Sequence, residues 1–161
     1  MQAGRIPATV PSSAMPKTEK PDRRGLKLLG TPSAFPETPS RDILETFDNR
    51  FPQRDYIIRF ECADFTSLCP ITGQPDFAHL LIEYVADRRC IETKSLKFYL
   101  ASFRNARAFN EEIANRILDD LVAVCSPRRL TVLGKFASRG GISLSVEANH
   151  DASKHRSRKR P

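Results

Sequence analysis

The sequence predicts an α+β domain in which an antiparallel four-stranded sheet carries two helices on one face. Four segments alternate apolar and polar residues, as half-buried strands do, and two segments repeat apolar residues with the period of an amphipathic helix. The order along the chain is strand, strand, helix, helix, strand, strand. Stacking both helices on one face of the sheet buries the apolar side of every element.

The four predicted strands cover residues 54–60, 80–84, 130–136 and 142–146. Their apolar faces consist of Tyr56, Ile58 and Phe60, then Leu80, Ile82 and Tyr84, then Leu130, Val132 and Phe136, and finally Ile142, Leu144 and Val146. The run Arg139-Gly140-Gly141 supplies the turn between the last two strands. Such a sheet has two open edges, so we expect a ring-shaped homo-oligomer that forms by edge pairing.

The two predicted helices lie between residues 93 and 127. Their apolar stripes are Leu96, Tyr99, Leu100 and Phe103 in the first, and Ile113, Ile117, Leu121 and Val124 in the second. Thr93 is a candidate N-cap of the first helix and Asn110 of the second, which ends near Pro127.

Both ends of the chain differ in composition from the middle. Eight of the twelve prolines lie within the first 52 residues, where we expect an extended segment over residues 30–52 with a short helical patch around residues 43–47. The chain is predicted to fray from about residue 149 onward. We therefore expect three parts: a disordered, basic and proline-rich arm (1–28), one folded domain (29–150) and a flexible basic tail (151–161).

The net charge of +7 is concentrated at the two ends. Residues 1–29 hold six basic and two acidic side chains, and residues 154–161 hold five basic ones, which leaves −2 for the middle. Basic ends bind polyanions weakly and in a salt-sensitive way, so a nucleic-acid binder that works through them stays open as an alternative.

The sequence also indicates a compartment. No apolar run approaches the ~20 residues that a membrane span needs, and the N-terminal residues lack the apolar stretch of a signal peptide. The four cysteines form no CxxC pair. We therefore expect a cytoplasmic protein with free thiols and no membrane partner.

Cys69 lies in the most informative run of the sequence, Phe65-Thr66-Ser67-Leu68-Cys69-Pro70-Ile71-Thr72-Gly73-Gln74-Pro75-Asp76-Phe77. The 18 residues between Phe60 and His79 show no periodicity. A loop of that length in a compact domain is usually functional. We therefore predict that any chemistry of this chain takes place in this loop.

A thiol is a good nucleophile only as the thiolate, and an unperturbed thiol is only a few per cent ionised near neutral pH. Asp76 takes the thiol proton, donates a proton to the reacting group or merely forms a turn, and the sequence leaves these roles open. The other cysteines fall in strand-end or helix patterns and are expected in the core: Cys62, Cys90 and Cys125.

The starts of the two helices offer groups for a ligand. Lys94, Ser95 and Lys97 lie near backbone N–H groups that suit phosphate, although a capped helix with a solvated basic face explains them as well. Glu111 either complements the dipole of the second helix or points into a cleft. In a cleft, its carboxylate would accept two hydrogen bonds from an amino-pyrimidinone ring.

Two common kinds of site are not expected. The histidines are His79, His150 and His155, and their spacing with the cysteines matches no structural zinc pattern, so we expect no metal. No G-x-G-x-x-G run occurs, which excludes a Rossmann cofactor site.

Taken together, residues 54–142 resemble the short, single-domain 7-cyano-7-deazaguanine reductases, the NADPH-dependent nitrile reductases of queuosine biosynthesis. The resemblance rests on the Cys69 run, Glu92-Thr93-Lys94-Ser95-Leu96-Lys97, Ser102-Phe103-Arg104-Asn105, Gly134-Lys135-Phe136 and Arg139-Gly140-Gly141-Ile142. It implies the tunnelling fold shared with GTP cyclohydrolase I and a ring with active sites between subunits. It also implies reduction of a nitrile to a primary amine with two NADPH, in the synthesis of a modified tRNA nucleoside.

By this resemblance, Cys69 is the nucleophile that adds to the nitrile carbon and forms a covalent thioimide, and Asp76 is the proton donor. The remaining residues that the resemblance implies are Ile91, Glu92 and Thr93 with Asn110 in the substrate pocket, Glu111 as the anchor of the deazaguanine base, and Lys94, Ser95, Arg139 and Gly140 as NADPH contacts.

The chain departs from the family pattern at two positions. Asn110 stands where the family usually has histidine, and an asparagine hydrogen-bonds a ligand but carries no proton. Thr93 replaces the commoner serine and keeps the hydroxyl. A metal-dependent cyclohydrolase of the same fold is the alternative enzyme class, although it needs more Cys and His ligands than the chain offers.

Overall fold

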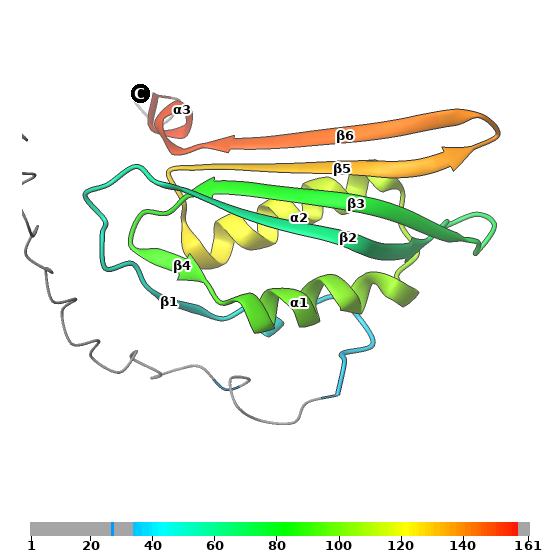
Figure 1. Ribbon diagram of the computed structural model, residues 1–161, viewed down its shortest axis with the longest axis horizontal. Coiled ribbons are helices and arrows are strands. Elements are labelled where there is room, and N and C mark those ends of the chain that lie inside the picture. The colour runs from blue at the N-terminus through cyan, green and yellow to red at the C-terminus, as the bar shows by residue number, and fades with distance from the viewer. Residues whose placement is uncertain (1–26, 28–33, 158–161) are drawn as a thin grey trace, which may run out of the picture.

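The computed structural model describes Lys27 and residues 34–157. A four-stranded antiparallel sheet carries the two long helices on one face (Figure 1). The predicted fold class and the order of its six main elements are confirmed. Apart from Lys27, the predicted disordered arm lies outside the described residues, as do residues 158–161 of the predicted tail.

The main sheet has the strand order β2-β3-β5-β6, so β2 and β6 are its open edges. Its strands are β2 (Ile57–Leu68), β3 (Pro75–Val85), β5 (Arg129–Arg139) and β6 (Ile142–Asp151). A separate two-stranded sheet pairs β1 (Thr46–Asp48) with β4 (Arg89–Ile91). The turn after Arg139 contains Gly140 and Gly141, both with positive φ, as predicted.

The helices are α1 (Thr93–Ala101), α2 (Asn110–Cys125) and the short α3 (Ala152–Ser157), with 3-10 turns η1 (Arg41–Ile43) and η2 (Ser102–Asn105). The inward faces of β3 and β5 are fully buried against both helices; the core includes Leu80, Ile82, Tyr84, Leu130, Val132, Leu96, Tyr99, Ile113, Ile117 and Leu121. Burial of each such side chain contributes about 1.5–3 kcal/mol. None of the helices in the described residues is long and apolar enough to cross a membrane.

The predicted 18-residue loop before His79 is wrong. β2 continues to Leu68 and β3 begins at Pro75, which leaves only residues 69–74 as a connection. The cause is a β-bulge, because Cys62 pairs with Leu80 whereas Phe65 pairs with Ala78, so β2 holds one extra residue. The bulge reverses the alternation of the strand, and the sequence pattern therefore disappears where the strand continues.

Two predictions about the ends of the domain are also wrong. The helical patch around residues 43–47 is replaced by the 3-10 turn η1 and by β1, whose Phe47 pairs with Cys90 of β4. The chain does not fray at residue 149, because β6 pairs with β5 as far as Asp151 and α3 follows.

Both predicted N-caps are displaced by one residue. Glu92 caps α1 in place of Thr93, since its carboxylate accepts hydrogen bonds from the N–H groups of Lys94 (2.9 Å) and Ser95 (2.7 Å). Asn110 is already helical, and the preceding Phe109 donates its N–H to the Glu112 carboxylate at 3.0 Å.

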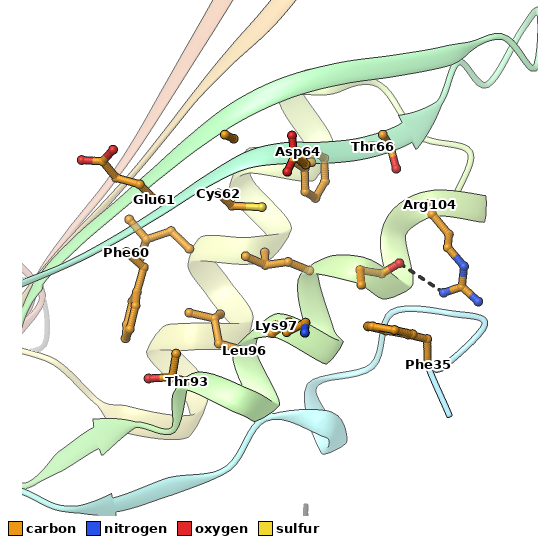
Figure 2. Close-up of a pocket in the computed structure, with 15 residues that line it drawn as sticks. Phe35, Phe60, Glu61, Cys62, Asp64, Thr66, Thr93, Leu96, Lys97 and Arg104 are labelled. Carbon is orange, nitrogen blue, oxygen red and sulfur yellow. Dashed lines mark hydrogen bonds between the residues drawn. The ribbon is translucent and has the colours of Figure 1, made fainter. Parts of the chain in front are cut away.

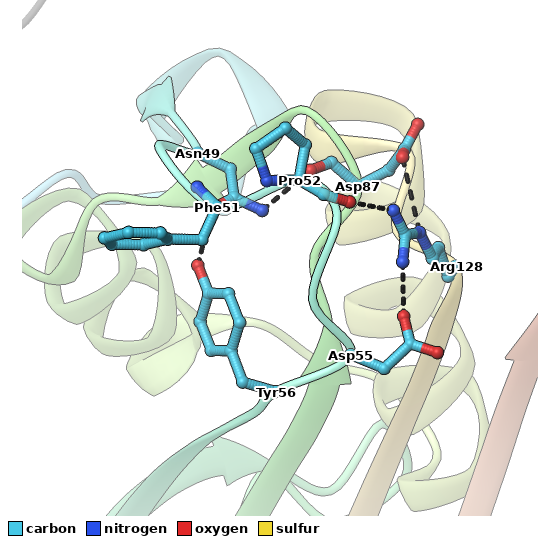
Figure 3. Close-up of polar contacts among 7 residues, drawn as sticks. All are labelled: Asn49, Phe51, Pro52, Asp55, Tyr56, Asp87 and Arg128. Atoms are coloured by element: carbon cyan, nitrogen blue, oxygen red, sulfur yellow. Dashed lines mark hydrogen bonds and ion pairs between the residues drawn. The ribbon is translucent and has the colours of Figure 1, made fainter.

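The segment before β2 is fixed to the rest of the domain by two side chains (Figure 3). Asn49 donates to the Asp87 carbonyl at 2.8 Å and accepts the Tyr56 hydroxyl proton at 2.7 Å. Arg128 binds the Asp55 carboxylate, the Pro52 carbonyl and the Asp87 carboxylate. This end of the sheet therefore pairs its polar groups within the chain.

Candidate active site

Cys69 begins the six-residue connection between β2 and β3, at the same end of the sheet as the turn between β5 and β6 (Figure 1). Its N–H donates to the Gln74 carbonyl at 2.8 Å, and its own carbonyl accepts the Gly73 N–H at 2.9 Å. Gly73 has φ +70°, and a Cβ there would lie 3.1 Å from the Arg107 guanidinium. The tight loop therefore requires glycine at this position.

The surroundings of the Cys69 thiol favour the thiolate. A hydrogen bond from the Thr72 side chain is the main cause, and backbone hydrogen bonds of Thr72 and Ile71 and the Arg139 side chain act in the same direction. Together they lower the Cys69 pKa to about 7. About half of the sulfur is then ionised at neutral pH, against a few per cent for an ordinary thiol.

The other three cysteines lie in or against the core. Burial raises the pKa of Cys125 to about 12 and also raises that of Cys62. Cys90 is buried in β4, where it pairs with Phe47 of β1. Cys69 is thus the cysteine that combines partial exposure with a lowered pKa. The prediction that the other three belong to the core is confirmed for Cys90 and Cys125, whereas Cys62 is half-buried and packs against the core.

Asp76 is the second residue of β3 and lies opposite Ser67 of β2, so it belongs to a strand and not to a loop. Its side chain is 10% exposed and forms an ion pair with Arg139, with 2.8 Å between Oδ1 and Nη2. The same nitrogen of Arg139 donates to the carbonyls of Pro75 (2.9 Å) and Gln74 (3.3 Å). Cys69, Asp76 and Arg139 therefore meet at one end of the sheet.

The start of α2 lies at this end as well. The N–H of Leu68 donates to the Ala106 carbonyl at 2.9 Å, and the N–H of Ala108 donates to the Leu68 carbonyl at 3.3 Å. This pairing places Asn110, and with it Glu111, close to the residue that precedes Cys69. Glu111 is exposed.

Two buried polar atoms near this end have no hydrogen-bond partner among the described residues: Ser67 Oγ and Asn110 Oδ1. Ser67 is fully buried and pairs with Asp76 across the strands. Because a buried polar atom without a partner costs free energy, both atoms are candidates to receive polar groups of a ligand. Ser67 was not among the predicted site residues.

The second set of predicted residues, Ile91 to Ser95, lies elsewhere in the chain. Ile91 donates its N–H to the Tyr84 hydroxyl at 3.0 Å, at the end of β3 remote from Asp76. Eight residues of strand separate Tyr84 from Asp76, which corresponds to about 26 Å. One chain therefore does not bring the two sets together.

The groups at the start of α1 are already paired within the chain. The Glu92 carboxylate accepts hydrogen bonds from the N–H groups of Lys94 and Ser95, the groups that were predicted to receive phosphate. Ser95 is fully buried, and its hydroxyl donates to the Glu92 carbonyl (2.8 Å) and accepts the Glu45 N–H (2.9 Å). The Lys94 ammonium lies over the Phe98 ring, 5.8 Å from its centroid.

A cavity of about 470 Å³ lies between β2 and α1 (Figure 2). Its lining is mainly apolar and includes Phe60, Phe65, Ile82, Leu96 and Leu100, with Thr93 at one end and the cations Lys97 and Arg104 beside it. Phe35 closes one side and packs on Phe98, with 4.9 Å between the ring centroids. Arg104 fixes the segment that contains Phe35 by donating to the carbonyl of Pro36 at 2.6 Å.

Comparison with known proteins shows the family of the chain. The model of the "QueF-like protein" family matches residues 75–155. The chain is 56% identical to the NADPH-dependent 7-cyano-7-deazaguanine reductase of Magnetococcus marinus, over 70% of this chain and 88% of that protein. It is 49% identical to the reductase of the same name from Bacteroides thetaiotaomicron, over 78% of this chain and 83% of the relative. The chain belongs to the 7-cyano-7-deazaguanine reductase family.

The fold of a solved relative agrees with this family. An archaeosine synthase QueF-Like in the apo form superposes with a TM-score of 0.54 at 24% identity, over 58% of this chain and 91% of that chain. The predicted resemblance to the reductases is therefore confirmed, together with the α+β tunnelling fold that it implied.

The reductase family model covers most of the predicted site residues but not all. Its matched range includes Asp76, Glu92, Glu111 and Arg139, and it begins six residues after Cys69. The role of Cys69 therefore rests on its motif and on the geometry of its loop. Thr72, which contributes most to the lowered pKa of Cys69, was not predicted. Its only signal in the sequence is a hydroxyl three residues beyond a cysteine in a loop rich in proline and glycine.

Proposed function

We propose that this chain reduces the nitrile of 7-cyano-7-deazaguanine to an aminomethyl group, with Cys69 as the nucleophile and NADPH as the reductant. Membership of the reductase family supports the substrate and the cofactor. The observation that carries the proposal is that the cysteine in the family's motif is also the thiol whose surroundings lower its pKa, to about 7.

The covalent step needs only groups of this chain and the substrate. The Cys69 sulfur adds to the nitrile carbon, and one π pair of the triple bond moves to nitrogen, which takes up a proton. Asp76 lies in an ion pair with Arg139, with 2.8 Å between Oδ1 and Nη2, and its side chain is the acid–base group that we assign to this step. Asp76 then receives the thiol proton and delivers it to nitrogen, so that S–H adds across the nitrile and a thioimide forms.

NADPH, when bound, supplies the hydride that reduces the C=N bond. The cations Lys97 and Arg104, which line an apolar cavity, suit the phosphate groups of such a cofactor. The predicted cofactor contacts remain part of the proposal, namely Lys94, Ser95, Arg139 and Gly140. The Ser95 hydroxyl is bonded to the Glu92 carbonyl and the Glu45 N–H, so we propose that Ser95 supports the cofactor site by fixing the junction between β4 and α1.

We propose that the substrate pocket lies between two copies of the chain in a homo-oligomeric ring. Glu111 and Asn110 come from the end that holds Cys69, whereas Ile91, Glu92 and Thr93 come from the opposite end of a neighbouring copy. Both edges of the sheet are open, and large apolar side chains are exposed at each end: Ile71, Phe77, Phe109 and Ile142 at one, and Phe47, Phe51 and Ile57 at the other.

The remaining proposals concern the setting of the reaction. We propose that the described region from β1 to β6 acts as one catalytic domain and that it works in the cytoplasm, where the four free cysteines stay reduced. For the alternative of a metal-dependent cyclohydrolase, residues 27 and 34–157 contain no cluster of three or more His, Cys, Asp or Glu placed to hold a metal. The basic ends that a nucleic-acid binder would use lie largely outside the described residues.

The test is turnover of the purified chain with 7-cyano-7-deazaguanine and NADPH. We expect two NADPH to be oxidised for each aminomethyl product, measured by absorbance and by mass spectrometry of the product, and none with Cys69→Ala. Substrate-dependent NADPH oxidation that survives in Cys69→Ala would contradict the proposal.

The shared pocket has a test of its own. Cys69→Ala and Glu92→Gln chains, each with little activity alone, are mixed, unfolded and refolded together. If the pocket draws on two copies, mixed oligomers contain some intact pockets and regain part of the activity. Failure to regain any activity, with mixed oligomers detected by native mass spectrometry, would show that each pocket belongs to one chain.

A further inference from the structure

Arg139 reaches Asp76 because β5 contains a bulge. Phe136 pairs with Leu144, whereas Arg139 pairs with Ile142, so two residues of β5 stand opposite the single Ser143 of β6. Phe136 faces the helices, and strict alternation would turn Arg139 to the other face. The extra residue reverses that alternation and brings Arg139 to the face of Asp76, as bulges near active sites often do.

A single nitrogen of Arg139 links three groups around the nucleophile. Nη2 lies 2.8 Å from Asp76 Oδ1, 2.9 Å from the Pro75 carbonyl and 3.3 Å from the Gln74 carbonyl. The Gln74 carbonyl also accepts the N–H of Cys69 at 2.8 Å. The guanidinium is therefore connected through one carbonyl to the backbone of Cys69 and through an ion pair to the predicted proton carrier.

The charges around the loop show what Arg139 contributes. Asp76 from β3 is negative, Arg139 from β5 is positive, and Arg107 contributes a second cation beside Gly73. The Asp76 side chain is largely buried. Without Arg139, the largely buried Asp76 side chain would lose its ion-pair partner, and the Cys69 sulfur would lose a hydrogen bond that favours the thiolate.

We propose that Arg139 is a positioning residue for the covalent step: it fixes the Gln74–Asp76 segment and neutralises Asp76, so that Cys69 reacts before any cofactor is needed. The inference rests on the proposed function, and it gives Arg139 a role besides the predicted contact with NADPH. A residue that only binds the cofactor would leave steps without NADPH unchanged, whereas a positioning residue would alter them.

The test compares the full-length parent with Arg139→Gln, Arg139→Lys and the matched control Arg59→Gln. The control removes another arginine–carboxylate pair of the same sheet, 2.6 Å between Arg59 and Glu83, remote from Cys69. The first readout is the rate of Cys69 alkylation by iodoacetamide as a function of pH, resolved by peptide mass mapping. The second is the rate at which 7-cyano-7-deazaguanine forms a covalent adduct without NADPH.

For Arg139→Gln we expect the midpoint of alkylation to rise by about one pH unit and the adduct rate at neutral pH to fall about tenfold or more. Arg139→Lys keeps the charge but not the planar donor, so it should fall between Arg139→Gln and the parent. Arg59→Gln should match the parent in both readouts. Circular dichroism and thermal unfolding show whether each variant is folded. If Arg139→Gln does not fold, Arg139→Lys is compared with the parent instead.

The inference is overturned if the Arg139 variants keep the parent's alkylation midpoint and adduct rate within twofold while only the KM for NADPH rises. In that case Arg139 is a cofactor contact alone. Failure of the proposed function is distinguishable from this, because a parent chain that forms no adduct still reports the role of Arg139 through alkylation, which involves no substrate.

Discussion

The two ends of β5 hold the same kinds of side chain and use them differently. Arg128 stands just before the strand and binds the carboxylates of Asp55 and Asp87, and Arg139 ends the strand and binds that of Asp76. Each arginine also takes a backbone carbonyl of a neighbouring segment. A cysteine lies near each end in the fold, Cys125 near the first and Cys69 near the second.

The direction of the hydrogen bond at sulfur explains why the pKa values of these two cysteines are shifted in opposite directions. The buried Cys125 thiol donates to the Leu121 carbonyl at 3.1 Å, which requires the proton to stay on sulfur, and burial raises its pKa to about 12. Cys69 accepts hydrogen bonds from Thr72, which favours the thiolate, and its pKa is about 7. The two environments thus move the same functional group in opposite directions.

The carboxylates at the two ends differ in exposure as well. The side chains of Asp55 and Asp87 are 63% and 45% exposed, against 10% for Asp76. Exposed ion pairs contribute little because water already solvates both charges. The ion pairs of Arg128 therefore lie at the surface, whereas the ion pair between Arg139 and Asp76 is largely buried on the aspartate side.

Exchange of the two cysteines for alanine gives the largest expected contrast. Cys69→Ala should lower kcat by more than about a thousandfold, as loss of a nucleophile does, without changing the urea midpoint, since the side chain is partly exposed. Cys125→Ala should keep the parent's kcat and lose about 1–2 kcal/mol of unfolding free energy. A large loss of kcat in Cys125→Ala, or none in Cys69→Ala, would remove the distinction between the ends.

The aspartates give the next contrast. Asp76→Asn removes the proposed proton carrier and should slow adduct formation without NADPH by about 10²–10⁴-fold. Asp55→Asn, the matched change at the other end, should leave the rate unchanged. Stopped-flow mass measurements on both variants check this, and equal rates in the two would show that Asp76 has no part in the proton transfer.

Thr72→Val removes the main cause of the low Cys69 pKa and should raise that pKa towards 9. The sign follows from the lost hydrogen bond to the thiolate: at pH 7 the ionised fraction falls from about half to a few per cent, so alkylation slows about tenfold, whereas at pH 10 both proteins react alike. Thr131→Val is the control, because its hydroxyl donates to Asn149 and not to Cys69. An unchanged pH profile in Thr72→Val would mean that the loop controls the thiol by other groups.

Arg128→Gln should have the smallest effect. Its partners Asp55 and Asp87 are exposed, so we expect a slight fall in the thermal midpoint, smaller than that of Cys125→Ala, and an unchanged alkylation profile of Cys69. A shift of that profile would show that the two ends of β5 are coupled, and it would contradict the conclusion that Arg128 and Arg139 act independently.

Much of the fold followed from local periodicity. The apolar faces of β3 and β5, the stripes of α1 and α2 and the glycine turn after Arg139 were all predictable, because each repeats a simple period that burial imposes. Both bulges escaped prediction, since an extra residue reverses the alternation without leaving a signal of its own. The long loop expected before His79 arose from the first bulge.

The candidate site also has a part that the sequence predicted and a part that it did not. The motif around Cys69 singled out the cysteine that we propose as the nucleophile, and its thiol is partly exposed. The ion pair between Asp76 and Arg139 could not be predicted, because it joins residues 63 positions apart across two strands and depends on the second bulge. The capping role of Glu92 was also missed, because Thr93 was expected to be the N-cap. The Glu92 carboxylate accepts hydrogen bonds from the N–H groups at which phosphate was expected.

The most direct measurement is the intact mass of the protein after incubation with 7-cyano-7-deazaguanine in the absence of NADPH. The account predicts one adduct per chain that equals the whole ligand, located on the peptide containing Cys69 and absent from Cys69→Ala. An adduct on another cysteine, or steady turnover by a protein that never carries the ligand covalently, would contradict it.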